Sequence, residues 1–158
     1  MKKWLFLITV VIVAALLIPF SMVAAQSSVT RTITEDDINA SFAITNPVRR
    51  QFSDLAVDLV APDTAVMTGV YTTRTFRSGT TSYNFAATYI LSLTNGRIFV
   101  SLDNLTVNGG AGSQSIVNQI NAQINASWIR YLQNEIPGRI TAFEVTDTAL
   151  IITYAVRS

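Results

Sequence analysis

Hydrophobic positions in residues 113–136 repeat with the period of an α-helix, and this repeat is the most informative pattern in the chain. At about 100° per residue, six large apolar side chains fall on one arc of roughly 120°. Asparagines occupy the opposite side. The pattern predicts an amphipathic helix whose apolar face packs on other elements. The six apolar residues are Ile116, Val117, Ile120, Ile124, Trp128 and Tyr131.

The last two turns of this helix carry more apolar residues than one buried face requires. Ile129, Leu132 and Ile136 form a second apolar line on the side that bears the asparagines. A segment that is apolar over most of its circumference must be covered on two sides or must meet another apolar partner. The closing strands of the chain could supply that cover, and so could a lipid chain or a membrane surface. The pattern leaves both open.

Strand-like alternation dominates the rest of the chain, with four runs before the long helix and two after it. Asn95-Gly96 is a strong signal for a two-residue hairpin turn. The register of that hairpin places three apolar pairs on one face of the sheet. These pairs are Leu93 with Ile98, Leu91 with Val100, and Tyr89 with Leu102. The apolar phase changes after the third pair, which predicts a bulge or a sharp bend near Asp103-Asn104.

A shorter helix is predicted just before these strands. Thr34 is a preferred N-cap residue, Asp37 occupies the capping-box position, and Pro47 predicts an end about three turns later. The order of elements is then one helix, four strands, the long helix and two strands. We expect an α+β fold in which a curved antiparallel β-sheet of about six strands is wrapped around one long amphipathic helix.

The N-terminal residues 1–25 have the pattern of an export signal. Two lysines precede an apolar stretch at residues 4–20, and small residues of the kind that signal peptidases recognise follow it. The alternative is an uncleaved membrane anchor, because about 20 apolar residues span a bilayer. Both place the remainder outside the cytoplasm, secreted or tethered to the membrane by residues 4–25. We interpret residues 26–32 as a short linker and residues 33–158 as a single domain.

Composition excludes several classes of function. Without the N-terminal segment, nine arginines face ten carboxylates, a net charge of −1, and no basic run remains, so nucleic acid is not an expected partner. The chain has no His and no Cys, which removes Ser-His-Asp and Cys-His catalysis and the commonest metal ligands. Asp54 and Asp58 could form an acid–base pair, but a solvated strand face explains their spacing better. We expect no enzyme, metal or cofactor.

Three segments, "ITEDDINASF", "NGRIFVSLDNLTVNGG" and "GRITAFEVTDTALIITY", resemble the exported LmeA-like phospholipid-binding family in their order and spacing. That family is related to the YpmS-like proteins and is similar in architecture to the tubular lipid-binding (TULIP) proteins. The resemblance covers nearly all of residues 33–156. It implies a strongly curved antiparallel sheet that cradles the long helix, an apolar groove for acyl chains, and no catalytic motif. NTF2-like or cystatin-like sheets also wrap one helix, but usually place it before the strands.

We therefore expect an exported protein that holds a lipid or another long apolar ligand between the curved sheet and the long helix. The alternative is a non-enzymatic structural or interaction module of the cell envelope with a filled core and no ligand. If a groove exists, the predicted facing of strands and helix selects its lining. We expect it to be lined by Phe85, Tyr89, Leu91, Ile120, Ile124 and Trp128, with Ile129 and Leu132 near its mouth.

Overall fold

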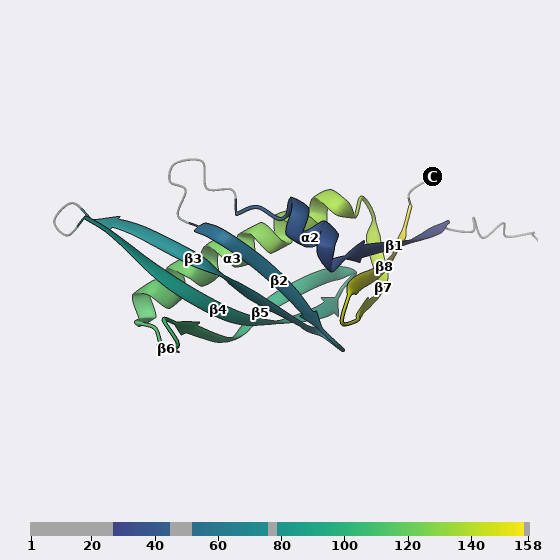
Figure 1. Cartoon of the computed structure of the whole chain (residues 1–158). Helices are drawn as coiled ribbons and strands as arrows, with labels where there is room; N and C mark the ends of the chain where they lie inside the picture. The colour runs from purple at the N-terminus through teal and green to yellow at the C-terminus, as the bar shows by residue number, and fades with distance from the viewer. Residues whose placement is uncertain (1–26, 45–51, 76–78, 157–158) are drawn as a thin grey trace, which may run out of the picture.

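The computed structural model describes residues 27–44, 52–75 and 79–156, and within these ranges the chain is an α+β protein with two helices and eight strands (Figure 1). In chain order the elements are β1 (Ser28–Thr34), α2 (Glu35–Ser41), β2 (Phe52–Val60), β3 (Thr64–Thr75), β4 (Gly79–Thr94), β5 (Arg97–Val107), β6 (Gly110–Ala111), α3 (Gln114–Glu135), β7 (Arg139–Val145) and β8 (Ala149–Ala155). The strands form two antiparallel sheets. One sheet has the order β2-β3-β4-β5-β6 and the other has the order β1-β8-β7.

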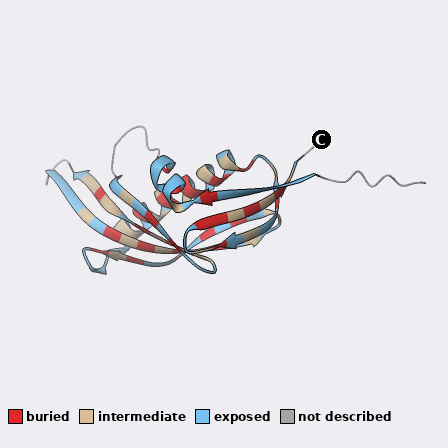
Figure 2. Ribbon diagram, turned by 45° about the vertical axis from the view of Figure 1, so that its right-hand side comes forward, coloured by how far each residue is buried: buried red, intermediate tan, exposed pale blue. Residues whose placement is uncertain are grey.

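Helix α3 lies along the five-stranded sheet, and its inward residues fill the main core (Figure 1). Ile120, Ile124 and Trp128 have no exposed surface. Asn125 also reaches the sheet, because its Nδ2 donates a hydrogen bond to the carbonyl oxygen of Val100 in β5 at 3.0 Å. Figure 2 shows buried residues, in red, on α3 and along the strands of both sheets.

Both ends of α3 agree with the predicted bounds to within one residue. Ser113 is the N-cap and Ile136 is the C-cap, where the backbone N–H of Ile136 donates to the carbonyl oxygen of Leu132 at 3.0 Å. Arg31 of β1 forms an ion pair with the carboxylate of Glu135 and donates from Nη1 to the Glu135 carbonyl oxygen at 2.9 Å. The C-terminal end of the helix, where a cation is favourable, is therefore tied to the three-stranded sheet.

The predicted β4–β5 hairpin is confirmed. Asn95 and Gly96 form its turn, and the three apolar pairs expected from the sequence stand opposite each other in the structure. The expected bulge is also present. Thr88 pairs with Asn104 and the next residue, Tyr89, pairs with Leu102, so Asp103 is the extra residue on β5.

Two expectations about the sheets were wrong. The strands form two sheets rather than one of about six strands. The edge of β5 pairs with β6 at one end, and the Asn125 amide donates to it in the middle. The β7–β8 hairpin pairs instead with β1, from Ser28 opposite Ala155 to Thr34 opposite Ala149. Most of the residues that we interpreted as a linker therefore belong to a strand. The face of β1 that carries Val29 and Ile33 is interrupted by Arg31, and only Ile33 is buried, so the strand has no continuous apolar face.

Helix α2 begins as expected and ends earlier. Thr34 and Asp37 form the predicted capping box, but the last helical residue is Ser41. Phe42 leaves the helical conformation and packs against Trp128 of α3, with ring centroids 4.9 Å apart and ring planes tilted by 47°. The side-chain amide of Asn39 bonds to both backbone groups of Val57, at 2.7 and 2.9 Å, and so covers part of the open edge of β2.

The expected export signal or anchor, residues 1–25, and the expected helix stop at Pro47 lie outside the described residues. Within the part of the chain that the structure describes, no helix combines the length and apolar character needed to span a bilayer.

The capping box of α2 predicts a pH-dependent contribution to stability. The Thr34 hydroxyl and backbone N–H donate to Asp37 Oδ2 at 2.6 and 3.1 Å, and these bonds lower the pKa of Asp37 below its usual value of 3.8. A carboxyl whose pKa is depressed by folding stabilises the folded state above its unfolded pKa, and that stabilisation is lost as the pH falls through the folded pKa. Asp37→Asn should therefore lower the free energy of unfolding at pH 7, and the difference from wild type should shrink below pH 3.8.

Urea denaturation at a series of pH values measures this difference. Asp36→Asn is the matched control, because it removes the same charge from the same helical turn and leaves the capping box intact. Equal, pH-independent losses in the two variants would show that the capping box makes no special contribution.

Candidate functional site

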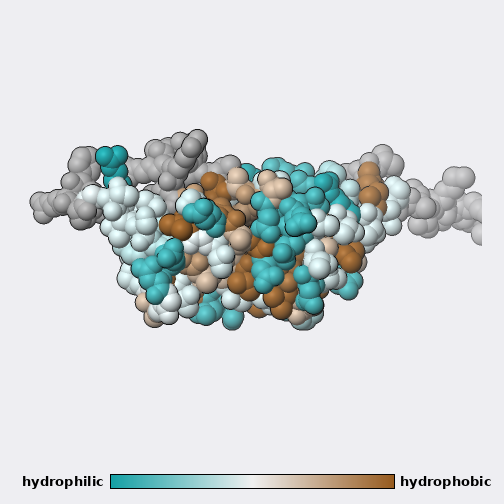
Figure 3. Space-filling model, in the orientation of Figure 1, coloured by the Kyte–Doolittle hydropathy of each residue, from teal (hydrophilic) through white to brown (hydrophobic). Residues whose placement is uncertain are grey.

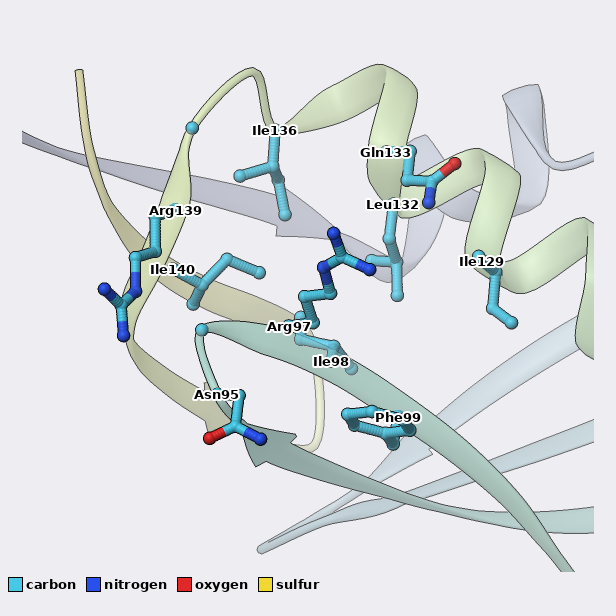
Figure 4. Close-up of a pocket in the computed structure, with 12 residues that line it drawn as sticks. Asn95, Arg97, Ile98, Phe99, Ile129, Leu132, Gln133, Ile136, Arg139 and Ile140 are labelled. Atoms are coloured by element: carbon cyan, nitrogen blue, oxygen red, sulfur yellow. The ribbon is translucent and has the colours of Figure 1, made fainter. Parts of the chain in front are cut away.

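A groove lies where the C-terminal turns of α3 pass over the start of β5 and reach β7 (Figure 4). Its volume is about 560 Å³, which is within the range of roughly 300–1,000 Å³ typical of small-molecule sites. Three segments form its walls. They are residues 95–99 at the β4–β5 turn, residues 138–140 at the start of β7, and four residues of α3 and its C-cap: Ile129, Leu132, Gln133 and Ile136.

The β4–β5 turn sets the position of two of these walls. Asn95 and Gly96 have φ values of 54° and 76°, which suit a tight two-residue hairpin. A Cβ atom on Gly96 would lie 2.6 Å from Cγ of Arg139, so only glycine lets the Arg139 side chain pack across the turn. The backbone N–H of Ile140 donates to the Gly96 carbonyl oxygen at 3.1 Å. The groove therefore stands at the point where the two sheets are joined.

The floor of the groove is apolar and continues onto an exposed apolar rim. Ile98, Leu132 and Ile136 are buried, whereas Phe99 on β5 and Ile129 on α3 are 52% and 42% exposed. Figure 4 shows the side chains of Ile129 and Leu132 projecting from α3 toward β5. The surface view in Figure 3 shows apolar residues, in brown, that lie between hydrophilic ones on one face of the molecule. A ligand in the groove could contact apolar groups on both the helix and the strand.

The charged residues of the groove are all positive. Arg97 and Arg139 line it, and no Asp or Glu does. Neither guanidinium forms an ion pair or a hydrogen bond with another residue in the described ranges. Glu135 precedes the groove residue Ile136 in the sequence, but its carboxylate is paired with Arg31.

A second hollow adjoins the groove on the other side of Arg139. Its volume is about 920 Å³, and it shares Asn95, Gly96 and residues 138–140 with the groove. Its further lining comes from Pro137 and the end of β8, including Tyr154. Because the Arg139 stem packs across Gly96, this side chain lies on the boundary between the two hollows.

Six of the eight residues predicted to line a groove lie instead in the packed core. Their exposed fractions are between 0% and 4%. The six are Phe85, Tyr89, Leu91, Ile120, Ile124 and Trp128. The other two, Ile129 and Leu132, do line the groove described above. The structure thus brings together the residues placed at the mouth and buries those placed in the interior.

The sequence did not predict the groove residues that follow the β4–β5 turn and the reversal between α3 and β7. These are chiefly Arg97, Phe99 and Arg139. Part of the signal was present. The hairpin register that turns Ile98 inward also turns its two neighbours outward, and the second apolar line of the helix already included Ile136. What the sequence did not contain was the position of the helix end relative to the hairpin turn.

Three buried side-chain atoms have no hydrogen-bond partner in the described ranges. They are the hydroxyl of Tyr89, Nε1 of Trp128 and Oδ1 of Asn121. Burial raises the pKa of Tyr89 far above its usual value of 10.0. Tyr71 is equally buried, but its hydroxyl donates to Oε1 of Gln119 at 2.7 Å. The two tyrosines differ in whether the buried hydroxyl is satisfied.

The acidic residues considered as a catalytic pair are on the surface. Asp54 and Asp58 are both exposed on β2, the edge strand of the five-stranded sheet. Among the described residues, no group of three or more potential metal ligands comes together.

Comparison with known proteins gives no relative on which to base a function, since no family model, curated protein or solved structure matches this chain.

Two conservative tyrosine substitutions should have opposite effects on stability. Tyr89→Phe removes a buried hydroxyl that has no partner among the described residues, so stability should stay equal or rise by about 1 kcal/mol. Tyr71→Phe removes the hydrogen bond that the Tyr71 hydroxyl donates to Oε1 of Gln119, so stability should fall by about 1 kcal/mol. Urea denaturation of both variants against wild type measures the two differences. A loss on Tyr89→Phe as large as that on Tyr71→Phe would contradict this account of the core.

Proposed function

We propose that this protein is an exported, non-enzymatic binding protein that holds a lipid or another long apolar ligand, and that the groove between α3, β5 and β7 is its site. The observation that carries the proposal is the exposure of Phe99 and Ile129 on two walls of a groove whose floor is already apolar. Exposed apolar groups gathered in one concave place are typical of binding sites. A ligand chain would cover both.

The gain from burying a chain of moderate length is comparable with the cost of binding it. Each methylene removed from water contributes about 0.8 kcal/mol, so ten of them would contribute about 8 kcal/mol. Binding costs an estimated 4–15 kcal/mol in lost freedom of motion. Burial of the exposed parts of Phe99 and Ile129 adds to the favourable side. A ligand with roughly ten buried methylenes would therefore bind measurably where the cost lies near the low end of this range, as for a groove that is already formed.

The sequence supports the same function in two further ways. Residues 1–25 have the pattern of an export signal or anchor, which would place the protein at or outside a membrane. The resemblance to the LmeA-like family implies a curved sheet that cradles a long helix, and lipid binding in that family is what we extend to this chain. The proposal places the ligand at the end of the helix rather than in the interior between helix and sheet.

One observation favours the alternative of a structural or interaction module of the cell envelope. The interior between α3 and the sheet is filled, as Ile120, Ile124 and Trp128 have no exposed surface. A protein of that kind would need no ligand. The two functions differ in one measurable property, which is whether the purified protein binds an apolar molecule.

Replacement of Ile129 by Gln should weaken binding of a fluorescent fatty acid by roughly tenfold, because the change removes apolar surface from one wall of the groove. Val60→Gln is the matched control, since Val60 is 41% exposed and does not line the groove. Fluorescence titration measures the dissociation constants. Solvent extraction of the wild-type protein followed by mass spectrometry identifies any lipid that co-purifies.

The proposal fails if no lipid co-purifies and no fluorescent fatty acid or phospholipid binds. If Ile129→Gln and Val60→Gln weaken binding equally, the groove is not the binding site. Circular dichroism of both variants separates loss of binding from loss of fold.

A further inference from the structure

The guanidinium groups of the two groove arginines are not used in polar contacts with the rest of the protein as the structure describes it. Arg97 and Arg139 have no ion-pair or hydrogen-bond partner in the described ranges. Compensation of the α3 helix dipole does not account for them, because Arg31 already donates to the carbonyl oxygen of Glu135 at 2.9 Å. With no carboxylate in the lining, the groove has a positive potential that nothing in its walls offsets.

The two arginines differ in how their charges lie relative to the apolar surface of the groove. Figure 4 places the guanidinium of Arg97 in the space between β5 and α3, beside Leu132, whereas that of Arg139 points away from α3. From Arg97 the apolar surface continues over Leu132 to Ile129 and Phe99. A molecule with its charge at Arg97 would therefore lay its apolar part along the rest of the groove.

We infer that the ligand is a single apolar chain that ends in an anionic group, a carboxylate or a phosphate monoester, and that Arg97 binds that group. This inference rests on the proposed function and specifies the chemistry of its ligand. The groove volume of about 560 Å³ is that of a site for one small ligand, which favours one chain over two.

Arginine suits this role for a physical reason. Its planar guanidinium can donate two parallel hydrogen bonds to a carboxylate or a phosphate, and such charge-assisted bonds are roughly twice as strong as neutral ones. Arg139, at the start of β7, adds positive potential, but its guanidinium points away from α3. A cationic head group would meet two positive charges and no negative one in the lining.

The test compares four ligands with one chain length and different head groups. Isothermal titration calorimetry of the purified protein at pH 8 would use decanoate, decyl phosphate, decanol and decyltrimethylammonium, each below its micelle concentration. The preferred anion should bind about tenfold more tightly than decanol, and the ammonium should bind most weakly. A preference for decanoate identifies a fatty acid type of ligand, and a preference for decyl phosphate identifies a phosphate monoester such as a single-chain phospholipid.

Two variants locate the anion. Arg97→Gln should weaken binding of the preferred anion about tenfold and leave binding of decanol unchanged. Arg74→Gln is the control, because it removes the same charge from an exposed position near the end of β3, away from the groove. The apolar residues 4–20 are common to both variants, so they cannot produce a difference between them.

The outcomes separate the inference from the proposed function. If decanol binds as tightly as both anions, or if Arg97→Gln and Arg74→Gln weaken anion binding equally, the anionic head group is overturned while the apolar groove stands. If none of the four ligands binds, both are overturned.

Discussion

Burial of one side of α3 against the five-stranded sheet is the interaction on which the other parts of the molecule depend. Full burial of a large apolar side chain stabilises the fold by about 1.5–3 kcal/mol, and Ile120, Ile124 and Trp128 are all fully buried. The chain contains no cysteine, so this core is not supported by disulfides. Trp128 also holds the end of α2, because the Phe42 ring packs against it with centroids 4.9 Å apart.

The groove follows from the length of this helix. With 22 residues, α3 is about 33 Å long, and its last turns reach the start of β5, where the hairpin turn ends the sheet. The chain then reverses through Pro137 and Gly138 into β7. The core covers one side of the last turns of α3. The other side of these helical turns faces only the β4–β5 hairpin turn. Ile129 is therefore left partly exposed although its neighbour Trp128 is fully buried.

Local signals in the sequence were sufficient for the parts of the fold that depend on neighbouring residues. The capping box at Thr34, the turn at Asn95-Gly96 and the bulge at Asp103 each arise from a few adjacent residues, and each is present. Strand β1 could not be predicted in this way, because its pairing partner β8 is more than a hundred residues away and its own sequence is polar. The groove was missed in part for the same reason, since Arg139 and Gly96 meet only in the folded chain.

The difference between the predicted and the observed lining also shows why a ligand would occupy the groove rather than the interior. A ligand could contact Tyr89, Ile124 or Trp128 only if the core opened, because none of them has exposed surface. Opening a close-packed core loses the same contacts that hold α3 on the sheet. Phe99 and Ile129 are exposed on elements that the core already holds in place, so a ligand can bind to them without that loss. The residues that stabilise the fold and those that would bind the ligand are thus largely separate.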